Sequence, residues 1–132
     1  MRLQLDTHVV VWLYTDASRS IPERVREALS EASELTISLI VLLELGYLHE
    51  LGRLPATPHK VLRELARLVG LGVDQTPFAT VVDAALRISW TRDPFDRLIV
   101  AQSMAAGVPL VTADKTILAN HPSAIWKHTT AD

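Results

Sequence analysis

The segment Thr91-Arg-Asp-Pro-Phe-Asp-Arg-Leu-Ile-Val-Ala-Gln-Ser103 decides how the rest of the chain is interpreted. Asp93 stands where a helix N-cap belongs, Pro94 takes the first helical position, and Asp96 follows the cap by three residues. This combination is typical of a helix start. The following residues are mostly apolar, so the segment predicts a packed helix with carboxylates at its positive end. Taken alone, the two aspartates can also be a capping pair with no other role.

Length and composition limit what such a helix can belong to. The chain has 132 residues, of which 48% are hydrophobic, so we expect a single domain over residues 1–132 with a real core. A formal net charge of −2 excludes binding to nucleic acid through bulk positive charge but allows a local basic patch. Because there is no cysteine, disulfides and thiolate metal sites are excluded. No apolar run is long enough to span a bilayer and no signal-peptide pattern is present, so we expect a cytoplasmic protein without membrane contact.

Strand and helix patterns alternate along the whole chain. Helical spacing or capping signals predict helices at residues 7–14, from 22 onward, at 38–51, 59–69, 77–88, 94–105 and 115–119. Short apolar segments at residues 2–5, 35–37, 70–74, 108–112 and 124–126 predict strands between them. This alternation favours an α/β fold, with helices covering a mostly parallel sheet in a three-layer α/β/α sandwich.

The helix predicted over residues 38–51 contains an anomaly. Its expected inward stripe includes Glu44, with leucines on both sides. A carboxylate on an apolar face costs several kcal/mol unless it is paired, protonated or bound to a cation. Glu44 is therefore either a candidate site residue or a buried, hydrogen-bonded core glutamate. The expected stripe consists of Ile40, Leu43, Tyr47, Leu48 and Leu51.

Two more acids follow predicted strands directly. Asp6 comes after the first strand, and Asp114 after the strand at residues 108–112. Sites in open parallel sheets form at the carboxyl ends of strands, near the point where the strand order reverses. Each aspartate can also be only an N-cap for the helix that follows. In a domain of this size, Asp6, Glu44, Asp96 and Asp114 can all reach one pocket.

Four carboxylates in one pocket need protons or cations to offset their repulsion. Two unit charges about 4 Å apart repel by roughly 4 kcal/mol at an effective dielectric near 20. A carboxylate-rich site without cysteine suits Mg²⁺ or Mn²⁺. Such an ion can activate a water molecule and neutralise charge on a phosphodiester, so phosphodiester hydrolysis is the reaction class that the pattern indicates.

At this point the chain resembles a known family. The motifs are Leu5-Asp-Thr-His8, Ser38 to Leu45 with its glutamate, Arg92-Asp-Pro-Phe-Asp-Arg97 continuing to Ala101-Gln-Ser103, and Thr112-Ala-Asp114. They resemble those of PIN-domain proteins, and within them the VapC-type toxins of prokaryotic toxin–antitoxin pairs. The resemblance covers essentially the whole chain. It implies a metal-dependent endoribonuclease with a five-stranded parallel sheet, usually homodimeric and held inactive by a cognate antitoxin protein.

The resemblance also suggests roles for the acids. Asp6, Glu44, Asp96 and Asp114 match the acidic quartet of the family. We predict that Asp6, Asp96 and Asp114 bind the metal ion. Glu44 is predicted to be a further ligand, directly or through water, or to position the attacking water. Asp93 is predicted to be the cap that sets Asp96 in place.

Neighbouring polar residues are candidates for substrate binding. Thr112 can hydrogen-bond a neighbouring carboxylate or the scissile phosphate, or it can be an ordinary strand threonine facing solvent. Arg97 and Lys115 adjoin the acids in sequence and can hold RNA phosphates, as can Arg92 with less support. All three can equally be solvated surface cations.

The histidines and tryptophans give weaker signals. The histidines show no metal-ligand spacing and are interpreted as surface or packing residues. The tryptophans are too scattered in the sequence to predict a base-stacking platform, which favours core or dimer packing. These residues are His8, His49, His59, His121 and His128, and Trp12, Trp90 and Trp126.

Two other functions remain as alternatives. An aspartate-nucleophile phosphatase would need a second aspartate two residues after Asp6, where His8 stands. A phosphotransfer receiver domain would need a phosphoacceptor after the third strand, where Asp74 fits only in part, and would leave Glu44 and Asp96 unexplained. The second alternative is a binding module without catalysis, in which the acids only cap helices.

Overall fold

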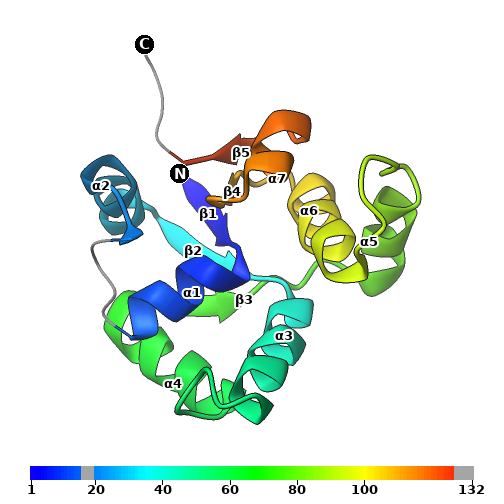
Figure 1. The fold of residues 1–132 in the computed structure, drawn as a ribbon. Helices are drawn as coiled ribbons and strands as arrows, with labels where there is room; N and C mark the ends of the chain where they lie inside the picture. Colours follow the sequence, from blue (N-terminus) through cyan, green and yellow to red (C-terminus); the bar gives the residue numbers. More distant parts are fainter. Residues whose placement is uncertain (16–19, 127–132) are drawn as a thin grey trace.

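A parallel five-stranded sheet forms the centre of the domain (Figure 1). The computed structural model describes residues 1–15 and 20–126. The strands lie in the order β3-β2-β1-β4-β5, and every neighbouring pair is parallel. Their bounds are β1 Arg2–Leu5, β2 Glu34–Ile37, β3 Leu71–Val73, β4 Leu110–Val111 and β5 Ala124–Ile125. Each lies within one residue or two of its predicted range.

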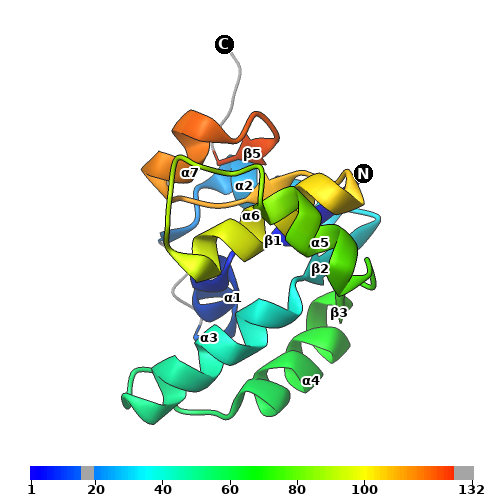
Figure 2. The same cartoon turned by 90° about the vertical axis from the view of Figure 1, so that its right-hand side faces the viewer.

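Helices cover both sides of this sheet. They are α1 Thr7–Tyr14, α2 Glu23–Glu31, α3 Leu39–Glu50, α4 Pro58–Val69, α5 Phe78–Ala85, α6 Pro94–Ala106 and α7 Lys115–Asn120. Figures 1 and 2 show α1 and α2 on one side, and α6 with α5 outside it on the other. The predicted three-layer α/β/α sandwich is therefore confirmed. No helix within residues 1–15 and 20–126 has the length and apolar character needed to cross a bilayer.

The strand order reverses next to β1, and this reversal positions the site. From β1 the chain builds outward through β2 to β3, then crosses through α5 and α6 to β4 on the other side of β1. Leu5 pairs with Val111, and the Asp6 N–H donates to the Val111 carbonyl over 3.0 Å. The residues that follow β1 and β4 are consequently neighbours in space, although more than a hundred positions separate them in sequence.

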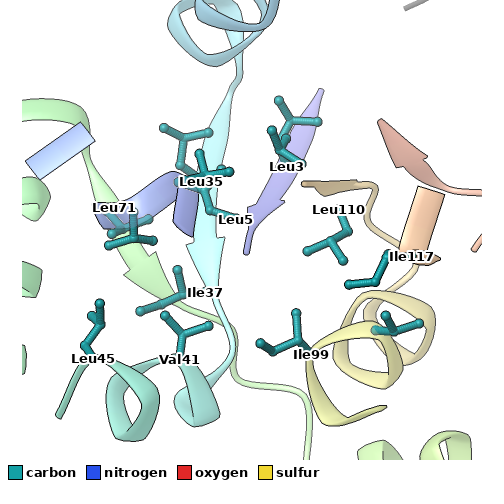
Figure 3. Close-up of a cluster of buried hydrophobic side chains, with 14 of the residues drawn as sticks. Leu3, Leu5, Leu35, Ile37, Val41, Leu45, Leu71, Ile99, Leu110 and Ile117 are labelled. Carbon is teal, nitrogen blue, oxygen red and sulfur yellow. The ribbon is translucent and has the colours of Figure 1, made fainter. Parts of the chain in front are cut away.

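The core is built where strand residues meet the helices on both sides. In β1, Leu3, Gln4 and Leu5 are all buried although successive side chains point to opposite faces. Both faces of the sheet are therefore covered, as expected for a parallel sheet. Figure 3 shows part of this core, which includes Leu35, Ile37, Leu71 and Leu110 from the strands and Val41, Leu45, Ile99 and Ile117 from the helices.

The predicted inward stripe of α3 is only partly correct, since Ile40 and Leu48 pack against the core but the other three members do not. Val41 and Leu45 are fully buried, whereas Leu43, Tyr47 and Leu51 have exposed fractions of 48, 46 and 67%. The reason is that α3 is apolar around most of its circumference, so the spacing of its apolar residues fits more than one face. Glu44 is half-buried at the edge of the packed face. The end of α5 was also misplaced, since the helix ends at Ala85 rather than at residue 88.

Candidate active site

The four predicted acids line one cavity. Its volume is about 320 Å³, and it lies beside the carboxyl ends of β1 and β4, where the strand order reverses. One acid follows β1, one follows β4, and two come from helices α3 and α6. The lining residues are Asp6, Thr7, His8, Val11, Glu44, Leu48, Asp96 and Asp114.

Asp6 is the most constrained of these acids. It is the N-cap of α1, and its Oδ1 accepts a 2.8 Å hydrogen bond from the Thr7 N–H. Its Oδ2 accepts a 2.7 Å hydrogen bond from the Thr112 hydroxyl. The side chain is almost fully buried. Because both carboxylate oxygens accept hydrogen bonds, the Asp6 side chain is held in one orientation.

Thr112 links the two acids that follow strands. Its Oγ1 donates to Asp6 and accepts a 3.0 Å hydrogen bond from the Asp114 N–H. The side chain is fully buried, so the interpretation as a solvent-facing strand residue is wrong. The sequence allowed a hydrogen bond to a neighbouring carboxylate or to the scissile phosphate, and the structure shows the bond to the carboxylate. Asp114 is in turn the N-cap of α7, where its Oδ1 accepts from the Ile117 N–H over 3.0 Å.

Glu44 reaches the cavity from the middle of α3. Its Oε1 accepts a hydrogen bond from the hydroxyl of Thr7. Burial raises the pKa of Glu44, the bond from Thr7 lowers it, and the charges of Asp6 and Asp93 raise it further. The net direction is upward, so Glu44 lies in a place that resists its negative charge.

Asp96 shows the strongest effect of crowding. Its pKa is raised from the ordinary 3.8 to about 7, first by burial and then by the charges of Asp93, Asp6, Asp114 and Glu44. Asp93 is the N-cap of α6, as predicted, and its Oδ1 accepts from the N–H groups of Phe95 and Asp96. A raised pKa caused by burial and by neighbouring acids is typical of a functional site.

His8 was missed as a site residue. Its Nε2 accepts a 2.8 Å hydrogen bond from the Ala113 N–H, and its Nδ1 lies 3.7 Å from Asp6 Oδ2. Since a backbone N–H can only donate, Nε2 carries no proton in this arrangement and the neutral ring carries its proton on Nδ1. The His8 ring therefore stabilises the turn before Asp114 through this hydrogen bond, and its Nδ1–H group faces Asp6. In the sequence, only the position of His8 two residues after Asp6 indicated that it could belong to the site.

The candidate phosphate-binding cations lie outside the acidic cavity. Arg97 is half-buried, and its Nη2 donates to the Ala85 carbonyl at the end of α5 over 2.9 Å. Lys115 is exposed at the first position of α7, and Arg92 is exposed before α6. Arg97 thus has a structural contact that the sequence did not indicate, and a role for it toward RNA stays a prediction.

The donor set suits a hard divalent cation. In residues 1–15 and 20–126, no three His, Asp or Glu side chains are arranged to ligate one ion directly as they stand. Mg²⁺, however, usually keeps several waters and takes only one or two carboxylates from the protein. Here several carboxylates share one cavity, and the pKa of Asp96 is raised to about 7. This arrangement suits such a partly hydrated ion.

Comparison with known proteins identifies the family. The model of the PIN domain matches residues 4–121. The chain belongs to the PIN-domain family. It is 32% identical over 130 residues to a protein named Ribonuclease VapC22 from Mycobacterium tuberculosis, an alignment that covers 92% of this chain and 96% of that protein.

Two solved structures have a similar fold. The structure of VapBC2 from Rickettsia felis, bound to a DNA fragment from their promoter, matches this PIN-domain chain with a TM-score of 0.66 and 19% identity. That match covers 96% of this chain and 98% of the other. VapBC-1 from nontypeable Haemophilus influenzae matches with a TM-score of 0.64 and 19% identity, over 96% and 97% of the two chains. At this identity the two structures establish the fold alone.

The raised pKa of Asp96 predicts how stability depends on pH in the absence of divalent ions. Between about pH 4 and pH 7 the folded protein holds a proton on Asp96 that the unfolded chain has released. The free energy of unfolding therefore falls as the pH rises through this range. Urea unfolding in chelator at several pH values should show this decline, and Asp96→Asn should reduce it and stabilise the protein near pH 7. Equal pH slopes for parent and variant would contradict the prediction, and Asp83→Asn, on the exposed face of α5, is the matched control.

Proposed function

We propose that this protein is a metal-dependent endoribonuclease that hydrolyses phosphodiester bonds in RNA and acts as the toxin of a toxin–antitoxin pair. The observation that carries the proposal is the cavity shared by Asp6, Glu44, Asp96 and Asp114. Burial and the neighbouring carboxylates raise the pKa of Asp96 to about 7, and a bound divalent cation would offset both effects. The similarity to a protein named Ribonuclease VapC22 supports RNA as the substrate. With RNA as substrate, the cytoplasm is the proposed place of action.

Each acid has a proposed role. Asp6, Asp96 and Asp114 hold Mg²⁺ or Mn²⁺, since they lie at the start of three helices around one cavity. Such an ion supplies a more acidic bound water and neutralises charge on the phosphate. Glu44, whose pKa is raised, either ligates the ion or accepts a proton from the attacking water. Arg97 and Lys115 are proposed to contact RNA phosphates at the rim.

The alternative functions have less support. A receiver domain needs its phosphoacceptor in the acidic cavity, but Asp74 is buried at the end of β3 and accepts hydrogen bonds from the Gln102 side chain and the Thr76 N–H. It lies in a different cavity from the four acids. A binding module without catalysis explains the caps made by Asp6 and Asp114 but not the placement of Glu44 and Asp96 beside them.

The first experiment is cleavage of RNA by the purified chain with Mg²⁺, with Mn²⁺ and with chelator. We expect metal-dependent fragments from the parent and a loss of at least a hundredfold in Asp96→Asn, because removing a metal-binding charge weakens both ion binding and transition-state stabilisation. Asp83→Asn should cleave as the parent does.

Two results would count against the nuclease proposal. One is intact RNA under every metal condition at protein concentrations that also bind the ion. The other is equal cleavage by parent and Asp96→Asn, which would point to a contaminating nuclease.

A second experiment uses Thr112, whose hydroxyl joins Asp6 to the Asp114 backbone. Thr112→Val keeps the shape but removes the hydroxyl, so Asp6 loses a donor. We expect it to lower Mn²⁺ affinity and the cleavage rate by roughly tenfold to a hundredfold. Thr112→Ser keeps both hydrogen bonds and should stay within a few-fold of the parent. If Thr112→Ser lowered Mn²⁺ affinity and the cleavage rate as much as Thr112→Val, packing of the threonine methyl group, and not the hydroxyl, would explain the effect.

We also propose a homodimer and an antitoxin protein as partner. Structures similar in fold are of VapBC complexes, which supports the partner. For the dimer, the supporting observation is a cavity of about 460 Å³ between α3, α5 and α6, beside the exposed side chains of Leu39, Leu43 and Phe78. Large exposed apolar patches often mark protein contacts.

Light scattering of the purified chain tests the dimer. We expect a dimeric mass for the parent and a monomeric mass for Leu43→Glu, because a charge on this face must lose water to be buried. Leu68→Glu, at an exposed leucine on α4, is the matched control and should remain dimeric. A monomeric parent at micromolar concentration would reject the proposal.

A further inference from the structure

Two of the tryptophans that are scattered in the sequence are neighbours in the fold. The ring centroids of Trp12 and Trp126 lie 5.9 Å apart, with an interplanar angle of 50°. The His8 ring lies 5.0 Å from Trp12 and 6.5 Å from Trp126. Both also pack against the hydrophobic core, as the sequence predicted, but their separation in sequence does not keep them apart in space. Trp90 lies apart, in a cavity formed by the ends of α6 and α7.

This aromatic cluster, defined as His8, Trp12 and Trp126, lies directly beside the acidic cavity. His8 lines that cavity, and Trp12 follows it by four residues on the same face of α1. Trp126 comes directly after β5, where the Ile125 carbonyl accepts a 3.1 Å hydrogen bond from the Thr112 N–H. The cluster thus adjoins both Asp6 and the turn that carries Asp114.

The cluster is only partly covered by protein. All three rings are of intermediate exposure. Part of each indole is therefore accessible to solvent.

Charge makes an aromatic surface useful at this place. In the described part of the chain, no lysine or arginine lines the acidic cavity itself, so its carboxylates repel a phosphate there until a cation is bound. Stacking of a base on an aromatic ring does not depend on a positive charge and tolerates any base. Only unpaired bases can stack in this way, because bases in a duplex are already stacked on one another.

We propose that Trp12 and Trp126 form a stacking subsite for an unpaired nucleobase of the nucleotide next to the scissile phosphate, with His8 between this subsite and the acidic cavity. The proposal rests on the proposed function, since it assumes that single-stranded RNA is the substrate. It adds a positioning role: the stacked base holds the adjoining phosphate over the carboxylates. A packing role alone is the competing explanation, because both tryptophans also contact the hydrophobic core.

The test measures RNA binding without cleavage. The Asp96→Asn chain is titrated, in Mg²⁺, with single-stranded RNA oligonucleotides that carry one abasic position, moved stepwise along the strand. We expect one position where loss of the base weakens binding by roughly 5- to 100-fold, the range for one stacked base. Adding Trp126→Leu should weaken binding of the intact oligonucleotide by a similar factor but leave the binding of that abasic oligonucleotide unchanged.

Matched variants separate stacking from packing. Trp126→Phe keeps an aromatic ring and should bind within about threefold of its parent, as should Trp90→Leu, which lies outside the cluster. Thermal melting checks that each variant is folded. If the chain with Trp126→Leu does not fold, the abasic series on the Asp96→Asn chain, with and without Trp126→Phe, still decides, because a subsite predicts one sensitive position in both.

Two results would overturn the subsite. One is equal binding of every abasic oligonucleotide, and the other is equal weakening of intact and abasic strands by Trp126→Leu. Because cleavage by the parent and by Asp96→Asn is measured separately, the nuclease function can stand while the subsite fails. A parent that cleaves no RNA, with or without metal, would reject the function instead.

Discussion

Repulsion among half-buried carboxylates is the constraint on which the rest of this site depends. Asp6, Glu44 and Asp96 share a cavity with Asp114, and each added charge raises the cost of the next. Hydrogen-bond donors offset part of this cost. The Thr112 hydroxyl and the Thr7 N–H donate to Asp6, and the Thr7 hydroxyl donates to Glu44. No such donor reaches the Asp96 carboxylate, in the part of the chain that the structure describes. Burial and the repulsion that these donors do not offset therefore raise the pKa of Asp96.

The sheet topology is what makes this crowding possible. Asp6 and Asp114 end neighbouring strands only because the chain leaves β1 in one direction and returns to its other side as β4. The third and fourth acids then come from α3 and α6, which contact each other in front of that reversal. Local signals serve the same arrangement, since the Asp93 cap and Pro94 fix where α6 begins and hence where Asp96 lies.

Sequence patterns predicted the elements better than their faces. The strands, the start of α6, and Asp6, Asp96 and Asp114 followed from short-range signals that involve capping and alternation. The packed face of α3 did not, because a helix that is apolar nearly all round has no single preferred face in its sequence. The contacts of His8 with the Ala113 N–H and of Trp12 with Trp126 join residues more than a hundred positions apart. Such contacts depend on strand order, which no local pattern specifies.

Asp6 and Asp114 each have two roles, and this affects how the fold can evolve. Each is both an acid of the cavity and the N-cap of the helix that follows it. Asparagine caps a helix about as well as aspartate does, so exchange of either residue for asparagine removes a charge while keeping the helix start. It also relieves repulsion among the remaining acids. Under the proposed function, descendants that keep the fold and any binding partner but have lost the chemistry are therefore one substitution away.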